Sequence, residues 1–296
     1  MEKMRTGLIV ESIESADAVD DIERIKPKTE RKSACTVTTV EVKTVQQSRI
    51  LEREIGTYVT VDMDTVCEIT DSDFENITDT IATTVRSLIS VKPTDRVLIV
   101  GIGNRDITED SLGPKCVDRT VVTRGLEKIY PELIDDGGFC SVCAINSNVF
   151  GVTGIESAEL ISGIAKELKP ALVIVIDALA TASISRLCKT VQISNTSLTP
   201  GGGVDNTRKE ISKSELKTQM LSIGMPTVID VKTVMHSVGA ADCDIKKALG
   251  DFENSLVATP VNIHTATDTA AKLIAFSLNK ALHYGMSTEE ILKFLY

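Results

Sequence analysis

The stretch ALVIVIDALA, residues 171–180, decides the fold because it joins a continuously aliphatic run to an acidic residue. Six successive apolar residues, 171–176, are typical of a strand in a parallel sheet that helices cover on both faces. The run RVLIVG at 96–101 predicts a second buried strand of the same kind. Strands of this type alternate with helical patterns from residue 96 onward. We therefore predict an α/β fold, a three-layer sandwich with a mostly parallel sheet.

The remaining elements follow from apolar spacing and from capping signals. Further strands are expected at 35–45, 57–63, 139–145, 188–194 and 219–223, and helices at 73–90 and 266–283. Pro114 is expected near the start of a helix that runs to about Leu126, because proline favours the first helical turn. Thr153 and Glu156 have the spacing of a capping box ahead of a helix to about Leu168.

The first thirty-odd residues are polar and acidic, which indicates a weakly structured arm. We assign residues 1–34 to this N-terminal arm, with a short propeptide as one interpretation of it. Residues 35–296 are expected to form a single α/β domain, in which 35–70 is a β-rich extension.

Composition limits the function. The 296 residues carry a formal net charge of −10, so direct binding to nucleic acid, which requires a basic face, is not expected. Met1 to Val10 lacks the apolar core of a signal peptide, and the aliphatic run 171–176 is too short to span a bilayer. The seven cysteines are scattered and odd in number, which favours reduced thiols and a cytoplasmic location.

Two acidic residues follow the strands expected at 96–101 and 171–176. Asp110 lies in the loop after the first strand, and Asp177 directly follows the second. Ligands of open parallel sheets bind beyond the carboxyl ends of the strands, so the two carboxylates would converge if those strands are neighbours. Two close carboxylates cannot both ionise cheaply, which suits one as an acid and the other as a base. The alternative is that each caps a helix or a turn, and spacing alone favours that role.

Other candidates carry weaker signals. Gly101 and Gly103 fit a dinucleotide-binding loop, but Asp106 occupies the place of its third glycine. Cys140 and Cys143 have CxxC spacing, yet on a strand they would point to opposite faces. The three histidines have no metal-ligand spacing, so we predict no metal site and no cofactor.

Several ordered blocks resemble the germination protease family of bacterial spores. The similarity runs almost continuously from residue 96 to about 235 and resumes near 256. The blocks are VGIGN at 100–104, DSLGP at 110–114, GVTGIE at 151–156, VIDALA at 175–180, the glycine-rich loop from Pro200 through Gly201 and Gly203 to Arg208, a block with Gly224 and Asp230, and a C-terminal segment that includes Asn279 and His283.

The resemblance implies a fold similar to that of hydrogenase-maturation endopeptidases and an atypical aspartic endopeptidase activity without metal. It implies substrates of the α/β-type small acid-soluble spore proteins, a homotetramer made as a zymogen, and action in the forespore or spore core during germination. By position, Asp110 and Asp177 would be the catalytic pair. Residues assigned to substrate binding or to support of the pair are Asn104, Glu156, Gly201, Gly203, Arg208 and Asp230.

The chain departs from the family pattern at particular places. Thr181 and Ala182 follow the DALA stretch where the family has Ala-Arg, and Gly7 stands where the family has an acidic residue before its processing site. Two alternatives therefore remain open: a catalytically silent or regulatory relative that binds spore proteins, and a protease of the same fold with a different substrate.

Overall fold

A computed structural model describes residues 6–16, 25–132, 138–201, 208–253, 255–284 and 286–295. Its centre is a nine-stranded sheet in the order β1-β2-β3-β7-β8-β6-β4-β5, with β9 paired to β8. The strands are β1 (Lys28–Arg31), β2 (Cys35–Val42), β3 (Gly56–Met63), β4 (Arg96–Ile102), β5 (Ser141–Asn148), β6 (Leu172–Thr181), β7 (Thr190–Ser194), β8 (Gln219–Asp230) and β9 (Val257–Ala258).

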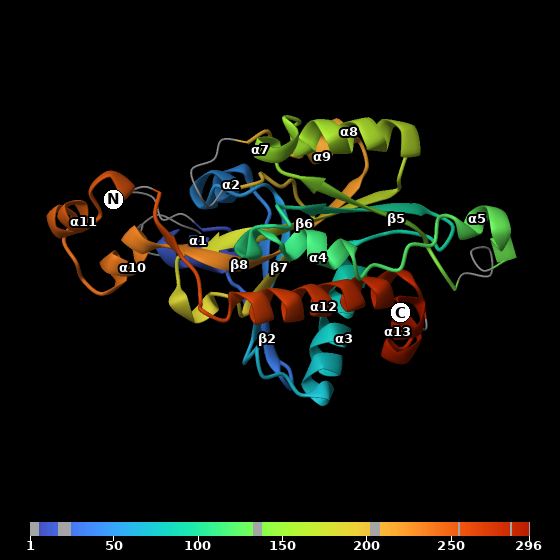
Figure 1. Ribbon diagram of the computed structural model, residues 1–296, viewed down its shortest axis with the longest axis horizontal. Coiled ribbons are helices and arrows are strands. Elements are labelled where there is room, and N and C mark those ends of the chain that lie inside the picture. Colours follow the sequence, from blue (N-terminus) through green and yellow to red (C-terminus); the bar gives the residue numbers. More distant parts are fainter. Residues whose placement is uncertain are drawn as a thin grey trace.

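Helices cover both faces of this sheet (Figure 1). α7 (Phe150–Thr153), α8 (Ser157–Leu168) and α9 (Lys213–Leu216) lie over one face, and α3 (Asp71–Leu88), α4 (Leu112–Val117) and α12 (Ile263–Leu282) lie over the other. The other helices are α1 (Ile9–Ala16), α2 (Val45–Leu51), α5 (Leu126–Ile129), α10 (Val231–Ser237), α11 (Asp242–Leu249) and α13 (Thr288–Leu295), with short 3₁₀ turns η1 (Thr108–Asp110), η2 (Ile184–Arg186) and η3 (Gly250–Phe252).

The predicted α/β sandwich is confirmed. Strands β5, β4, β6 and β8 are parallel neighbours, and β7, β3, β2 and β1 extend the sheet in antiparallel pairing. The extension contains the two Thr/Val-rich strands expected at 35–45 and 57–63. Hydrophobic clusters fill both sides of β6: Ile174 and Ile176 belong to the cluster with α12, whereas Val173 and Val175 belong to the cluster with α8.

Two predicted elements differ in extent. β6 continues to Thr181, so Asp177 lies inside the strand rather than after it. The helix expected from Pro114 to about Leu126 begins at Leu112 and ends at Val117. It ends early because the N–H groups of Thr123 and Arg124 both donate to the carbonyl of Val142, which draws this segment to β5.

The capping box predicted at Thr153 and Glu156 is displaced by three residues. Thr153 ends the short helix α7, and Glu156 is the N-cap of α8. The carboxylate of Glu159 accepts the N–H of Glu156 at 3.4 Å, which completes the box.

The expectation of a weakly structured arm is wrong for residues 9–16, which form the helix α1. Leu8 and Ile9 are fully buried, in a cluster with Val40, Val42 and Tyr58. An amphipathic face therefore packs this segment onto the antiparallel part of the sheet, although acidic residues surround it in the sequence.

Glycines at three positions let the loop after β4 fold back onto the sheet. A Cβ on Gly113 would lie 2.3 Å from the carbonyl oxygen of Ile102 and 2.7 Å from that of Ile176. Gly103 has φ +122°, and a Cβ there would lie 1.9 Å from the carbonyl oxygen of Asp110. Gly101 is in similar contact with Gly113. The start of α4 and the turn η1 are thus pressed against the ends of β4 and β6.

We expect Gly113→Ala to lower the free energy of unfolding by about 1–3 kcal/mol, because the added methyl group overlaps backbone atoms that cannot move apart freely. Gly163→Ala is the matched control: Gly163 lies within α8 with open space where the Cβ would go, so alanine should stabilise by about 0.5–1 kcal/mol. Urea denaturation of both variants measures the difference. Equal effects of the two substitutions would contradict the close approach at Gly113.

Candidate active site

Asp177 is a buried carboxylic acid in the middle of the parallel sheet. Its strand β6 lies between β4 and β8, and the side chain is 4% exposed. One carboxylate oxygen accepts the backbone N–H of Ala178 at 2.9 Å, and the backbone of Gly201 also hydrogen-bonds to this carboxylate. The neighbouring strand presents Gly224 beside Asp177, so no side chain from β8 covers it at that register.

Asp110 ends the turn η1, which contacts both β6 and β8. Its carboxylate accepts the N–H of Asn104 at 2.7 Å, and its own N–H donates to the carbonyl of Ile107 at 3.0 Å. The loop is therefore closed on itself, with the carboxylate half-buried beside the end of β4. Since β4 and β6 are hydrogen-bonded neighbours, the condition for Asp110 and Asp177 to converge is met.

Burial and, next, the negative charge of Asp110 raise the pKa of Asp177 to about 7, against the opposing effect of the hydrogen bonds from the backbone of Ala178 and Gly201. Burial also raises the pKa of Asp110, while the N–H of Asn104 opposes the shift and Glu109 adds to it. Among the residues that the structure describes, neither carboxylate forms an ion pair with Lys, Arg or His. Two close carboxyl groups without a cation hold one proton between them most readily, so near neutral pH one is protonated and the other is charged.

Two of the other predicted residues lie at the pair. Asn104 holds Asp110 through its backbone N–H, and its side-chain oxygen accepts the N–H of Asp106 at 3.0 Å, which shapes the loop. Gly201 supplies backbone hydrogen bonding to Asp177. Gly203 lies outside the described residues.

Glu156 and Arg208 form a separate cluster at the start of α8. The guanidinium of Arg208 lies 3.8 Å from the carboxylate of Glu156 and 5.2 Å from the ring centre of Phe150. Phe150 directly follows Val149 at the carboxyl end of β5, so the cluster is at the same edge of the sheet as the carboxylate pair.

Asp230 is a helix cap. Its carboxylate accepts the N–H of Thr233 at 3.0 Å at the beginning of α10. The alternative of capping, which spacing favoured for the acidic candidates, therefore describes Asp230. Asp110 also holds its own loop through the N–H of Asn104, whereas Asp177 accepts the N–H of Ala178 within a buried strand.

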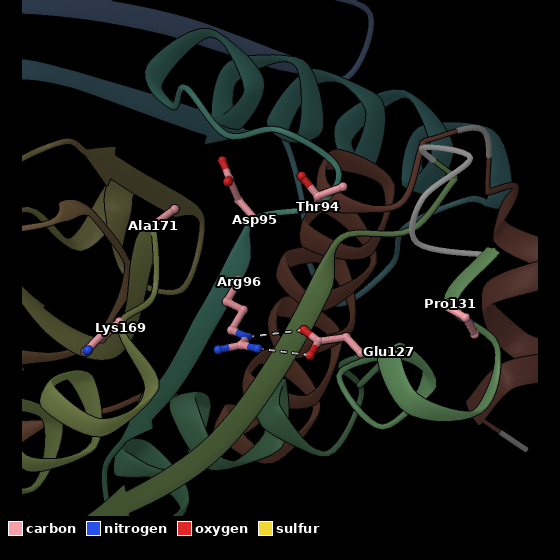
Figure 2. Close-up of a pocket in the computed structure, with 7 residues that line it drawn as sticks. All are labelled: Thr94, Asp95, Arg96, Glu127, Pro131, Lys169 and Ala171. Atoms are coloured by element: carbon pink, nitrogen blue, oxygen red, sulfur yellow. Dashed lines mark hydrogen bonds and ion pairs between the residues drawn. The ribbon is translucent and has the colours of Figure 1, made fainter.

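A pocket lies at the opposite edge of the sheet (Figure 2). It surrounds the amino end of β4, where Arg96 pairs with Glu127 at 3.3 Å. Its lining consists of Thr94, Asp95, Arg96, Glu127, Pro131, Lys169 and Ala171. The carboxylate pair lies at the carboxyl ends of the strands, so this pocket is not part of the candidate site.

Two further features bear on the site. Within the described ranges, no three His, Cys, Asp or Glu side chains are grouped as metal ligands would be. No helix in those ranges is long and apolar enough to cross a membrane. Sequence reasoning missed Glu11, a buried carboxylate from α1 that binds the end of β6, because its partners are more than 160 residues away in the chain.

Comparisons with known proteins agree on one family. The model of the germination protease family matches residues 5–240. A germination protease of Clostridium perfringens strain SM101 is 34% identical over 88% of both chains, and one from Clostridium tetani is 32% identical over 99% of both. One from Clostridium acetobutylicum is 33% identical over the full length of both.

A solved structure also aligns with part of the chain. It is the [NiFe] hydrogenase maturation protease HycI from Thermococcus kodakarensis, at 19% identity and a TM-score of 0.38, covering 66% of this chain and 98% of that one. The family match and the full-length relatives are the stronger findings, and by them this chain belongs to the germination protease family.

Proposed function

We propose that this protein is an endopeptidase that hydrolyses α/β-type small acid-soluble spore proteins, with Asp110 and Asp177 as its acid and base. The observation that carries the proposal is a buried Asp177 whose pKa of about 7 is raised by burial and by the neighbouring Asp110. Family membership supports the peptidase activity. The substrate, a homotetrameric zymogen and a location in the spore core rest on the family resemblance alone.

The pair supplies both proton transfers that amide hydrolysis needs. The charged carboxylate accepts a proton from a water molecule as the water oxygen bonds to the peptide carbonyl carbon. The protonated carboxyl group then gives its proton to the amide nitrogen, and the carbon–nitrogen bond breaks to leave a free amine and a carboxylic acid. The proton taken from water restores the single shared proton on the pair.

The surroundings of Asp177 fit this role. Hydrogen bonds from the backbone of Ala178 and Gly201 hold the carboxyl group in place. Gly224 lies beside it on β8 and has no side chain to cover it. The Arg208, Glu156 and Phe150 cluster lies at the same edge of the sheet. We propose that this cluster contacts the substrate chain, with Arg208 toward acidic side chains and Phe150, which is 43% exposed, toward apolar ones.

A catalytically silent relative is the second candidate, and one departure favours it. Ala182 occupies the place of the family's arginine, and its N–H donates to Glu11 rather than to a group at the carboxylate pair. An arginine beside a carboxylate lowers its pKa and orients it, so a chain without one depends on backbone N–H groups for that purpose. Cleavage of a purified small acid-soluble spore protein separates the two candidates.

We expect Asp110→Asn and Asp177→Asn each to lower cleavage of a purified small acid-soluble spore protein by about 10²–10⁴-fold, since each removes one proton transfer. The measurement is the rate of appearance of discrete fragments, with and without a chelator, which should not change the rate. Asp95→Asn is the control, because Asp95 lies in the pocket at the opposite edge of the sheet.

Full activity in both Asn variants would contradict the carboxylate mechanism. No cleavage by the folded wild-type chain would favour the silent relative.

Stability should also depend on the protonation of Asp177. Its pKa is raised in the folded protein above the ordinary 3.8, so the folded state binds the proton more tightly than the unfolded state. The free energy of unfolding should therefore fall as pH rises from about 4 to 7 and then level off, by several kcal/mol, since each pKa unit corresponds to about 1.4 kcal/mol.

Asp177→Asn should remove most of this decline, and become more stable than the wild type above pH 7. Urea midpoints at pH 4.5 and 8 measure it, with Asp106→Asn, an exposed position in the loop that carries Asp110, as a control for the lost charge. The same decline in wild type and Asp177→Asn would show that Asp177 is not the buried acid described above.

A further inference from the structure

The N-terminal segment Thr6–Ala16 lies on the end of the strand that carries Asp177. The N–H of Gly7 donates to the carbonyl of Ala180 at 2.8 Å. Two residues separate Ala180 from Asp177 on β6, and one of them, Leu179, packs against the cluster formed by α1. The segment therefore contacts the catalytic strand through its backbone and through its side chains.

That end of β6 has little other support. β4 pairs with β6 only as far as Ile176, so residues 177–181 are held by β8 alone within the sheet. The pairing with β8 is itself irregular between Leu179 and Ala180. A segment next to Asp177 with one sheet partner and a register shift depends on groups outside the sheet for its position.

Glu11 supplies such a group. Its carboxylate, 1% exposed, accepts the hydroxyl of Thr181 at 2.5 Å and the N–H of Ala182 at 2.8 Å. Thr181 is the last residue of β6, and Ala182 directly follows it. The hydroxyl of Thr6 also donates to Glu11, and Arg186 lies 3.6 Å away. A buried carboxylate with this many donors is costly to remove, because each donor is then left without a partner.

Two side chains from elsewhere fix the segment that carries Glu11. Gln192 of β7 donates to the carbonyl of Gly7 at 2.7 Å and accepts the N–H of Ile9 at 2.6 Å. Arg53 donates to the carbonyl of Thr6 at 2.7 Å and to the hydroxyl of Ser12 at 3.2 Å. The segment is thus bound through its backbone and its side chains to β7 and to the connection between α2 and β3.

Leu179 packs between the N-terminal segment and the residues beside Asp177. A Cβ on Gly7 would lie 3.0 Å from the Cβ of Leu179, and a Cβ on Gly224 would lie 2.6 Å from its Cγ and 2.8 Å from the carbonyl oxygen of Asp177. Leu179 is therefore enclosed between the N-terminal segment and the residue of β8 that pairs with Asp177.

We propose that Glu11 is a positioning residue of the peptidase: from α1 it fixes Thr181 and Ala182, and the N-terminal segment thereby acts as a strap on the strand that carries Asp177. The inference rests on the proposed function of Asp177. It assigns the segment to the catalytic domain, in place of the arm that composition suggested.

The test compares Glu11→Gln and Glu11→Ala with Glu14→Gln. Glu14 lies on the same helix and pairs with Arg186 at 2.6 Å, but its side chain is exposed and, among the described residues, forms no hydrogen bond with β6. We expect Glu11→Gln to lower kcat by about 10-fold, with KM nearly unchanged, because a small displacement of a catalytic group is costly to rate. Glu11→Ala should lower kcat further, and Glu14→Gln should match the wild type.

A second measurement separates positioning from loss of fold. The Asp177 carboxyl band is followed by infrared difference titration, wild type minus Asp177→Asn, and again in the Glu11→Gln background. If Glu11 keeps the strand end closed, water reaches Asp177 in the variant and its titration moves to lower pH, together with the corresponding limb of the pH–rate profile. Asp110 is the titratable group acting on Asp177, and it is unchanged in all these variants.

The outcomes are distinct. A Glu11→Gln enzyme with the kcat, pH profile and Asp177 titration of Glu14→Gln overturns the positioning role while leaving the carboxylate mechanism intact. An active Asp177→Asn enzyme overturns the carboxylate mechanism instead, and the infrared titration then still shows whether Glu11 controls the surroundings of Asp177. If Glu11→Ala fails to fold, Glu11→Gln alone decides.

Discussion

The exclusion of water from the carboxyl group of Asp177 is the constraint on which the site depends. A carboxylate in an aliphatic strand loses its hydration, so the protein must either neutralise it or surround it with donors. This chain uses both means. Burial and the negative charge of Asp110 raise the pKa of Asp177 so that it keeps its proton, and the backbone of Ala178 and Gly201 hydrogen-bonds to it, without a cation among the described residues. The glycines at 101, 103 and 113 follow from the same requirement, because the loop carrying Asp110 must approach the strand ends at backbone distance.

The central strands could be predicted because burial on both faces leaves an aliphatic signature that needs no knowledge of partners. The adjacency of β4 and β6 was left open by the sequence, because β5 lies between them in the chain and alternation alone does not fix the order of strands in a sheet. The limits of β6 could not be predicted from the same pattern, because after Ile176 the strand is fixed by pairing with β8. Likewise α4 ends where Thr123 and Arg124 bond to Val142, a contact that local helix propensity does not contain.

Some residues of the candidate site could likewise be selected from the sequence, and others could not. Asp110 and Asp177 were selected because they follow aliphatic runs and because the surrounding blocks resemble a family. Asp230 was included on the same grounds and is a cap, which shows that position after a strand does not distinguish the two roles. Glu11 was missed because the segment around it is polar in composition, while its function depends on Thr181, Ala182 and Gln192, all distant in sequence.

By the family resemblance, the peptide bond between Gly7 and Leu8 occupies the position of a processing site, and in this fold its backbone groups are hydrogen-bonded. The N–H and carbonyl of Gly7 both have partners, and the side chain of Leu8 is inaccessible. A protease binds its substrate as an extended chain with free backbone groups, so cutting here requires α1 to detach first. If the chain is processed at this bond, the rate of cleavage would report the free energy of that local opening, and mutations in the core beneath Leu8 would change that rate without touching any catalytic group.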